Sequence, residues 1–169
     1  MRWQIEPLGA WPYAVTQRPK GNPFRASWND TLKLLAAELE HLNVVGAVAI
    51  QVVGDSADVR RDGMLRAHAK LGYRGVAISF TGKHGPLTYP CDTYAGQYYA
   101  DPPDWQINAR AIALGLQALR AVDRYGIAGH GEQYRGWTAI GTGAAAPFAT
   151  AAEAIRWLIG IVGPDAPSD

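Results

Sequence analysis

The segment VVGAVAIQVV (44–53) is the feature that most limits how this chain can fold. It is almost continuously apolar and rich in β-branched residues, which predicts a strand covered on both faces. A second run of this kind, GVAISF, follows at 75–80. Helical patterns flank both runs, so the sequence predicts an α+β domain: a small, mostly antiparallel sheet with one helix before it and two helices after it.

The first helix is predicted in SWNDTLKLLAAELEHL (27–42). Ser27 is a favourable N-cap, and Asp30 follows three residues later, in the spacing of a capping box. Apolar residues then recur at helical spacing, at Trp28, Leu32, Leu35 and Leu39.

Turn signals separate the predicted strands. Asp62-Gly63 lies in DVRRDGMLRAHAK (58–70), where it predicts a hairpin. GKHG (82–85) predicts a second turn, after which PLTYPCDTY (86–94) returns as an antiparallel strand. Pro90 lacks an N–H group, so this strand is expected to lie at an edge of the sheet or to end there.

Two further helices are predicted after the strands. The longer one, 104–126, has Asp104 as its expected N-cap and Gly126 as its expected end. Asn108 falls on its apolar side and should need hydrogen-bond partners if it is buried. The shorter helix, 149–162, has Thr150 as a possible N-cap.

These elements predict three segments. Residues 1–26, rich in proline and tryptophan, form an extended lead-in with a short strand near Trp3–Ile5. Residues 27–162 form a single α+β domain, and residues 163–169 form a frayed tail.

The composition is that of one ordinary globular domain. The chain has 169 residues, of which 48% are hydrophobic and 18% charged. A single cysteine, Cys91, excludes an internal disulfide and favours a reducing compartment. The sequence shows neither a signal-peptide pattern nor an apolar run of membrane-spanning length, so a cytoplasmic location without membrane contact is expected.

The sequence contains no common catalytic signature: a Walker A loop, HExxH, GxSxG and paired CxxC motifs are all missing. The GTG at 141–143 has no lysine after it, so it does not indicate a phosphate loop. His84, Cys91 and Asp92 lie close together in sequence and are a weak zinc candidate. We therefore predict no catalytic residues, no metal and no cofactor, and keep one alternative, a metal-dependent nuclease or hydrolase using Asp62, His84 and Asp92.

Positive charge is unevenly distributed along the chain. Residues 59–84 contain six lysines and arginines against one aspartate, a net charge of +5, and residues 1–26 sum to +3. Arginine and lysine bind phosphates, and exposed aromatic rings stack on bases. The residues predicted to contact nucleic acid are Arg60, Arg61, Arg66, Lys70, Arg74, Arg110, Arg124 and Arg135.

A protein partner is the competing interpretation. Six tryptophans in 169 residues suit a protein–protein surface, where tryptophan, tyrosine and arginine are common anchors. The residues predicted for such a surface are Trp3, Trp11, Tyr98 and Tyr99. Tyr125 and Trp137 are instead expected to pack the end of the long helix.

Residues 105–140 (WQINARAIALGLQALRAVDRYGIAGHGEQYRGWTAI) resemble a region of small proteins of actinobacteria and their phages. Those proteins are described as DnaJ-like because a J domain commonly follows this region. RRDGMLRAHA…GVAISF (60–80) and the stretch Asn22-Pro23-Phe24-Arg25 followed by Trp28, Thr31 and Leu32 are similar to it as well. A J domain acts through a His-Pro-Asp loop, whereas Gly163-Pro164-Asp165 here has glycine in the place of histidine and only four residues after it.

The resemblance therefore implies an upstream module that lacks a working J domain. The leading hypothesis is a non-enzymatic accessory protein of a phage or prophage that binds nucleic acid or a protein assembly. A degenerate co-chaperone-like protein, unable to stimulate a chaperone ATPase, is a further alternative. The oligomeric state is left open.

Overall fold

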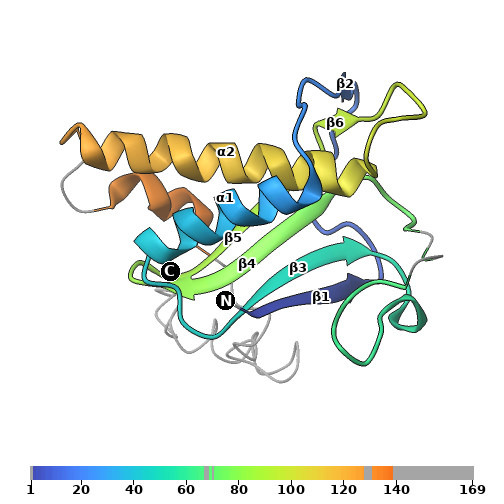
Figure 1. Cartoon of the computed structure of the whole chain (residues 1–169). Helices are drawn as coiled ribbons and strands as arrows, with labels where there is room; N and C mark the ends of the chain where they lie inside the picture. Colours follow the sequence, from blue (N-terminus) through green and yellow to red (C-terminus); the bar gives the residue numbers. More distant parts are fainter. Residues whose placement is uncertain (1, 67–68, 70, 128–130, 139–169) are drawn as a thin grey trace, which may run out of the picture. The chain divides into compact units, whose positions relative to one another are not determined.

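Four strands form the main sheet in the order β1-β3-β4-β5 (Figure 1). They are β1 (Arg2–Leu8), β3 (Ala47–Val53), β4 (Val76–Gly82) and β5 (Gly85–Cys91). Pairing is parallel between β1 and β3 and antiparallel between the others. The predicted α+β class with a mostly antiparallel sheet is confirmed.

The computed structural model describes residues 2–66, 69, 71–127 and 131–138. All of them belong to one compact unit, residues 1–139. The third predicted helix (149–162, with Thr150), the predicted tail (163–169), the GTG at 141–143 and Lys70 lie outside the described residues. No helix within the described ranges combines the length and the hydropathy that crossing a membrane requires.

The strand expected near Trp3–Ile5 is longer than predicted and occupies one edge of the sheet. Ile5 of β1 lies opposite Ile50 of β3, although 45 positions separate them in the sequence. Helix α1 (Trp28–His41) lies in the connection between these two parallel strands. The first 26 residues also supply β2 (Lys20–Gly21), which pairs with β6 (Tyr94–Ala95) in a second, two-stranded sheet.

Helices α1 and α2 (Asp104–Arg124) cover one face of the main sheet (Figure 1). Val48, Ile50 and Val52 of β3 point toward this face and are buried, whereas the residues between them are only half-buried. The expectation that 44–53 is buried on both faces was therefore wrong. Gln51 shows the reason: it lies on the other face, where its amide donates to Glu6 Oε2 at 3.1 Å.

The ends of both helices follow from local hydrogen bonds. Ser27 and Asp30 form the predicted capping box of α1. In α2 the N-cap is Pro103 rather than Asp104, because the Asp104 carboxylate turns back to accept from Gly96 N at 2.8 Å. Gly126 ends α2 as predicted: its φ is +72°, and its N–H donates to Asp123 O at 3.0 Å.

Asn108 is the central polar residue of the core, and it is fully buried. Its Nδ2 donates to Arg74 O, Tyr94 O and Asp104 O at 3.1, 2.9 and 3.0 Å. Its Oδ1 accepts from Tyr94 N at 2.9 Å and from Cys91 Sγ at 3.3 Å. Asn108 therefore has the hydrogen-bond partners that the sequence analysis expected, and these bonds connect α2 to the end of β5 and to β6.

The predicted turns are also confirmed. Gly63 adopts a φ of +81° between Val59 and Leu65, which form an isolated antiparallel bridge. Lys83 and His84 connect β4 to β5. Pro86 and Pro90 both lie in β5, which is an edge strand as expected.

Candidate functional site

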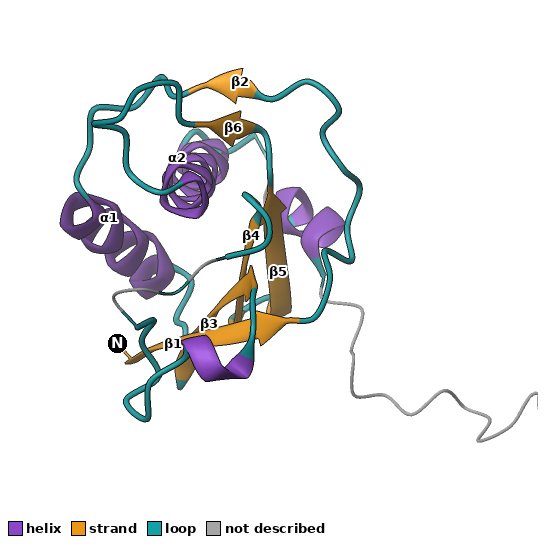
Figure 2. Cartoon of the chain, turned by 90° about the vertical axis from the view of Figure 1, so that its right-hand side faces the viewer, coloured by secondary structure: helices purple, strands orange, loops and turns teal. Residues whose placement is uncertain are grey.

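The two long helices begin next to each other. Trp28, the first residue of α1, and Trp105, the second of α2, pack edge to face with ring centroids 4.8 Å apart. The positive ends of both helix dipoles therefore lie at the same end of the domain. Figure 2 looks onto this end and shows β2 and β6 beside α2. The short η1 (Ser56–Asp58) follows β3 in the chain.

We call this region the α2 N-terminal end. It comprises residues 18–25 and 92–101, which contain the β2–β6 ribbon, together with residues 55–66, residues 71–74 and the first turn of α2. A groove of about 570 Å³ opens here between residues 65–74 and 103–106. Its walls include two guanidinium groups, from Arg66 and Arg74, and two aromatic rings, from Tyr73 and Trp105.

Arg74 is held rigidly in this groove. Its Nε donates to Asp92 O at 2.8 Å and its Nη2 donates to Thr16 O at 2.5 Å. The guanidinium also lies over the Tyr73 ring, 5.0 Å from the centroid. Since these contacts use only part of its donors, the remaining N–H groups are presented in a fixed orientation.

Asp92 organises the same corner of the domain. It accepts hydrogen bonds from Thr16 N at 2.8 Å, from the Thr16 hydroxyl and from the Tyr73 hydroxyl. Burial alone would raise the pKa of Asp92, but these hydrogen bonds and the charge of Arg74 outweigh it and lower the pKa. Asp92 thus holds Arg74 through its backbone carbonyl and through an ion pair between its carboxylate and Arg74 Nη2 at 3.7 Å.

The 59–66 hairpin is held to the domain at its turn and at its C-terminal end. Gly63 O accepts from Ile5 N of the sheet at 2.8 Å, and Arg66 Nε donates to Ala57 O at 2.8 Å. Arg60 forms an exposed ion pair with Asp62 at 2.8 Å. Arg61 is exposed, and no described residue forms an ion pair or a side-chain hydrogen bond with it.

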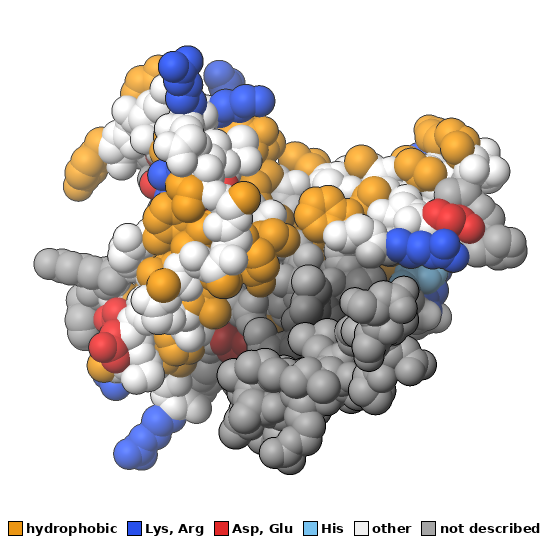
Figure 3. All heavy atoms as spheres, turned by 180° about the vertical axis from the view of Figure 1, so that it is seen from behind, with side chains coloured by type: hydrophobic (Ala, Val, Ile, Leu, Met, Phe, Trp, Pro, Cys, Tyr) orange, Lys and Arg blue, Asp and Glu red, His pale blue; other side chains and the backbone are white. Residues whose placement is uncertain are grey.

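Cations and aspartates are nearly balanced in number at the α2 N-terminal end. Seven described cations belong to it: Arg18, Lys20, Arg25, Arg60, Arg61, Arg66 and Arg74. Its six aspartates are Asp55, Asp58, Asp62, Asp92, Asp101 and Asp104, and two of them pair with Arg60 and Arg74. Seen from behind, Lys and Arg side chains gather over the β2–β6 ribbon (Figure 3). The region is therefore almost neutral overall, but its ribbon presents exposed cations that a phosphate can bind.

Three further predicted residues, Arg110, Arg124 and Arg135, do not line this groove. Arg110 is half-buried in α2, and its Nε has no hydrogen-bond partner among the described residues. Arg124 lies in the last turn of α2, and Arg135 lies in the η2 segment that follows it. Both are exposed and belong to the opposite end of that helix. The structure thus brings together four of the eight predicted residues, namely Arg60, Arg61, Arg66 and Arg74.

The residues predicted for a protein partner are also divided. Trp3 packs against the core, and Trp11 packs on Tyr13 and Tyr73. Tyr98 and Tyr99 are the strongly exposed members of the set, and both lie in the loop between β6 and α2.

The expectation for the end of α2 was partly wrong. Tyr125 is 70% exposed and contacts the Arg124 guanidinium instead of the core. Trp137 is 39% exposed and stacks on Tyr89. Tyr134, in η2 (Glu132–Trp137), is the residue that packs this end, with only 2% of its surface exposed.

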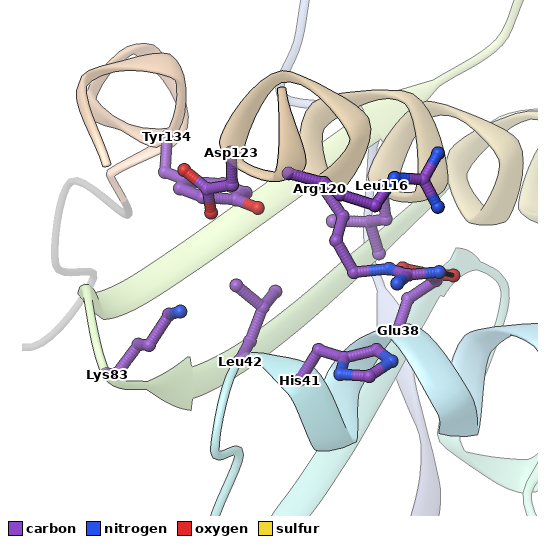
Figure 4. A pocket seen from close by; sticks show the side chains of 9 residues that line it. Glu38, His41, Leu42, Lys83, Leu116, Arg120, Asp123 and Tyr134 are labelled. Carbon is purple, nitrogen blue, oxygen red and sulfur yellow. Dashed lines mark hydrogen bonds and ion pairs between the residues drawn. The ribbon is translucent and has the colours of Figure 1, made fainter. Parts of the chain in front are cut away.

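A second pocket, of about 310 Å³, lies between the last turns of α1 and α2 (Figure 4). Its main polar feature is a bidentate pair: Arg120 donates to Glu38 through Nε at 2.6 Å and through Nη2 at 3.0 Å. Glu38 is buried, so this pair joins the two helices inside the domain.

The polar side chains on the opposite side of this pocket also interact with one another. Asp123 accepts from Gln133 Nε2 at 2.5 Å and lies beside the Tyr134 hydroxyl (Figure 4). Burial, with the neighbouring negative charge of Asp123, raises the pKa of Tyr134. The side chains around this pocket therefore connect α1, α2 and η2 within the domain.

The three residues considered as zinc ligands, His84, Cys91 and Asp92, do not form a metal site. His84 stacks on Tyr134 at 4.7 Å, Cys91 donates to Asn108, and Asp92 is occupied by Thr16 and Tyr73. Within the described ranges, no three histidine, cysteine or acidic side chains come close enough to hold a metal ion. The three residues considered for a metal-dependent nuclease or hydrolase, Asp62, His84 and Asp92, likewise do not come together.

Sequence reasoning missed several residues of the α2 N-terminal end: Arg18, Lys20, Arg25, Tyr73 and Trp105. The net charge of residues 1–26 was the only signal for the first three. Comparisons with protein-family models, curated proteins and solved structures gave no significant match. The resemblance to the region upstream of J domains therefore stays a prediction.

Proposed function

We propose that this chain is a non-enzymatic module that binds nucleic acid through its α2 N-terminal end. The observation that carries the proposal is the groove of about 570 Å³, in which Arg66 and Arg74 lie beside Tyr73 and Trp105. Guanidinium groups bind phosphates and aromatic rings stack on bases, so this combination suits a nucleotide unit of a polymer.

The surroundings of the groove support the same function. Outside the groove, the same end carries four further exposed cations, so the phosphates of neighbouring nucleotides have partners: Arg18, Lys20, Arg25 and Arg61. The adjacent starts of α1 and α2 add their dipoles to this field. An accessory role in a phage or prophage is the wider context that we propose for such a module.

The test compares two double variants with equal loss of charge. Lys20→Ala with Arg61→Ala removes two cations from the α2 N-terminal end. Lys33→Ala with Arg135→Ala removes two exposed cations from other parts of the surface. Fluorescence anisotropy with labelled oligonucleotides, over about 50 to 200 mM salt, measures the affinity and its salt dependence.

We expect the wild type to bind and its affinity to fall steeply with salt. The Lys20/Arg61 variant should bind more weakly, and the slope of log affinity against log salt should fall by about 1.5. The Lys33/Arg135 variant should keep the wild-type slope. Absence of binding at low salt would overturn the proposal, and equal losses in both variants would overturn the assignment to this end.

A further inference from the structure

Tyr98 and Tyr99 are the most exposed aromatic side chains in the described part of the chain. Their exposed fractions are 76% and 108%, so neither ring has a packing role in the domain. They are consecutive residues in the loop that connects β6 to α2. Two consecutive rings without a packing partner in the described part of the chain are free to contact a molecule outside it.

The loop that carries these rings is fixed by hydrogen bonds. Asp101 Oδ2 accepts from Gln97 N at 2.7 Å and from Tyr98 N at 2.9 Å. Asp101 Oδ1 accepts from Asn22 Nδ2 at 3.0 Å, which ties the loop to the segment after β2. The backbone below the two tyrosines is therefore already ordered, and a partner meets little entropic cost there.

The strand beside this loop supplies positive charge. Lys20 lies in β2, Arg18 lies two residues before it, and Arg25 follows four residues after β2. All three are exposed, and no described residue forms an ion pair with them. Asp101, the nearest acidic residue of the loop, is occupied by the hydrogen bonds that hold the loop.

The neighbours of the tyrosines do not form an apolar patch. Gly96, Gln97, Ala100 and Asp101 flank them, and the adjacent ribbon carries the cations. The centre of a protein–protein interface is depleted in charge and surrounds its aromatic anchors with apolar groups. Isolated rings among cations are instead typical of surfaces that bind single-stranded nucleic acid.

We propose that the Tyr98–Tyr99 loop and the β2 cations form a binding surface for single-stranded nucleic acid, with unpaired bases stacked on the two tyrosines. This inference rests on the proposed function and names its substrate class. In a duplex the faces of the bases are covered by their neighbours, so protruding rings reach only unpaired bases. The preference for single strands should therefore depend on the tyrosines.

The experiment measures binding of the full chain to a labelled oligothymidine and to a labelled duplex of equal length. Tyr98→Ala with Tyr99→Ala is the test variant. Tyr125→Ala is the matched control, because Tyr125 is similarly exposed but lies at the other end of α2. Tyr99→Trp keeps a stacking ring, and circular dichroism and thermal melting check that each variant is folded.

We expect the wild type to bind the single strand more tightly than the duplex. Tyr98→Ala with Tyr99→Ala should lose at least about tenfold in affinity for the single strand and little for the duplex. Tyr125→Ala and Tyr99→Trp should retain single-strand binding, and photocrosslinking with 5-iodouracil in the oligonucleotide should label Tyr98 or Tyr99.

The two proposals fail in different ways. Absence of binding to either nucleic acid at low salt overturns the proposed function and this inference together. Equal affinity for single strand and duplex, unchanged in the tyrosine variant, overturns this inference alone. Single-strand binding that is unchanged in the tyrosine variant also overturns this inference, whatever the affinity for the duplex.

Discussion

Arg120 of α2 holds Glu38 of α1 through two hydrogen bonds, and the carboxylate in this pair is 2% exposed while the arginine side chain is 30% exposed. The two partners therefore differ in what their loss leaves behind. Without Glu38, Arg120 can turn toward water, whereas without Arg120 the Glu38 carboxylate stays buried and unpaired.

This difference predicts an asymmetric pair of variants. Arg120→Met should destabilise the domain more than Glu38→Gln, since an uncompensated buried carboxylate costs about 3 to 5 kcal/mol. The free energy of unfolding from urea titration measures both. Equal losses, or a larger loss for Glu38→Gln, would show that the pair is open to solvent in solution.

Asn108 provides a second test of stability. Asn108→Ala removes a buried amide whose five contacts join α2 to β5, β6 and Arg74. The backbone groups left without partners should cost at least about 2 kcal/mol. Asn108→Asp should not rescue this loss, because a carboxylate cannot donate to the three carbonyl groups. Gln117→Ala, on the exposed side of α2, is the control and should leave the urea midpoint unchanged.

Asp92 predicts a dependence of stability on pH. Its pKa in the folded state is lowered: burial opposes the shift, but the hydrogen bonds from Thr16 and Tyr73 and the charge of Arg74 exceed it. A lowered pKa stabilises the fold at pH values above the unfolded pKa of about 4, and this contribution is lost as pH falls below it. Asp92→Asn should be less stable than wild type at neutral pH, and the difference should shrink in acid. A difference that stays constant down to pH 2–3 would contradict this role.

Two glycines with positive φ make a matched comparison. Gly126→Ala places a Cβ in open space, so only its φ of +72° is unfavourable, at about 1 to 2 kcal/mol. Gly131 has a similar φ of +74°, but a Cβ there would lie 2.3 Å from Cε1 of His84. Gly131→Ala should therefore lower the melting temperature more than Gly126→Ala. Equal shifts would mean that the His84 ring moves aside at no cost.

Local features of the fold were predictable from the sequence. The capping box at Ser27, the turn at Gly63, the end of α2 at Gly126 and the edge position of the strand with Pro90 each depend on neighbouring residues. The need of Asn108 for hydrogen-bond partners was also predictable, because a polar side chain on the apolar face of a helix becomes buried when the helix packs. The Asp104 cap was wrong because Gly96, in the loop before the helix, competes for the same carboxylate.

The candidate site was less predictable because it is assembled from distant segments. Arg74 was predicted, but nothing in its surroundings in the sequence indicates Thr16 as a partner. Lys20 joins the site only because β2 pairs with β6, which lies more than seventy residues later. Arg124 and Arg135 are also arginines close to aromatic residues in the sequence, but they lie at the other end of α2.

The prolines of the outer strands bear on how this protein behaves at high concentration. Pro86 and Pro90 remove two donors from β5, and Thr138 bridges to the same strand at Leu87. On the other outer strand, Pro7 lacks a donor and Gly63 occupies the N–H of Ile5. Neither border of the sheet offers an unbroken row of hydrogen-bonding groups, so stacking of copies through their strands is disfavoured. Concentrated solutions should thus resist fibril formation for as long as the sheet stays intact.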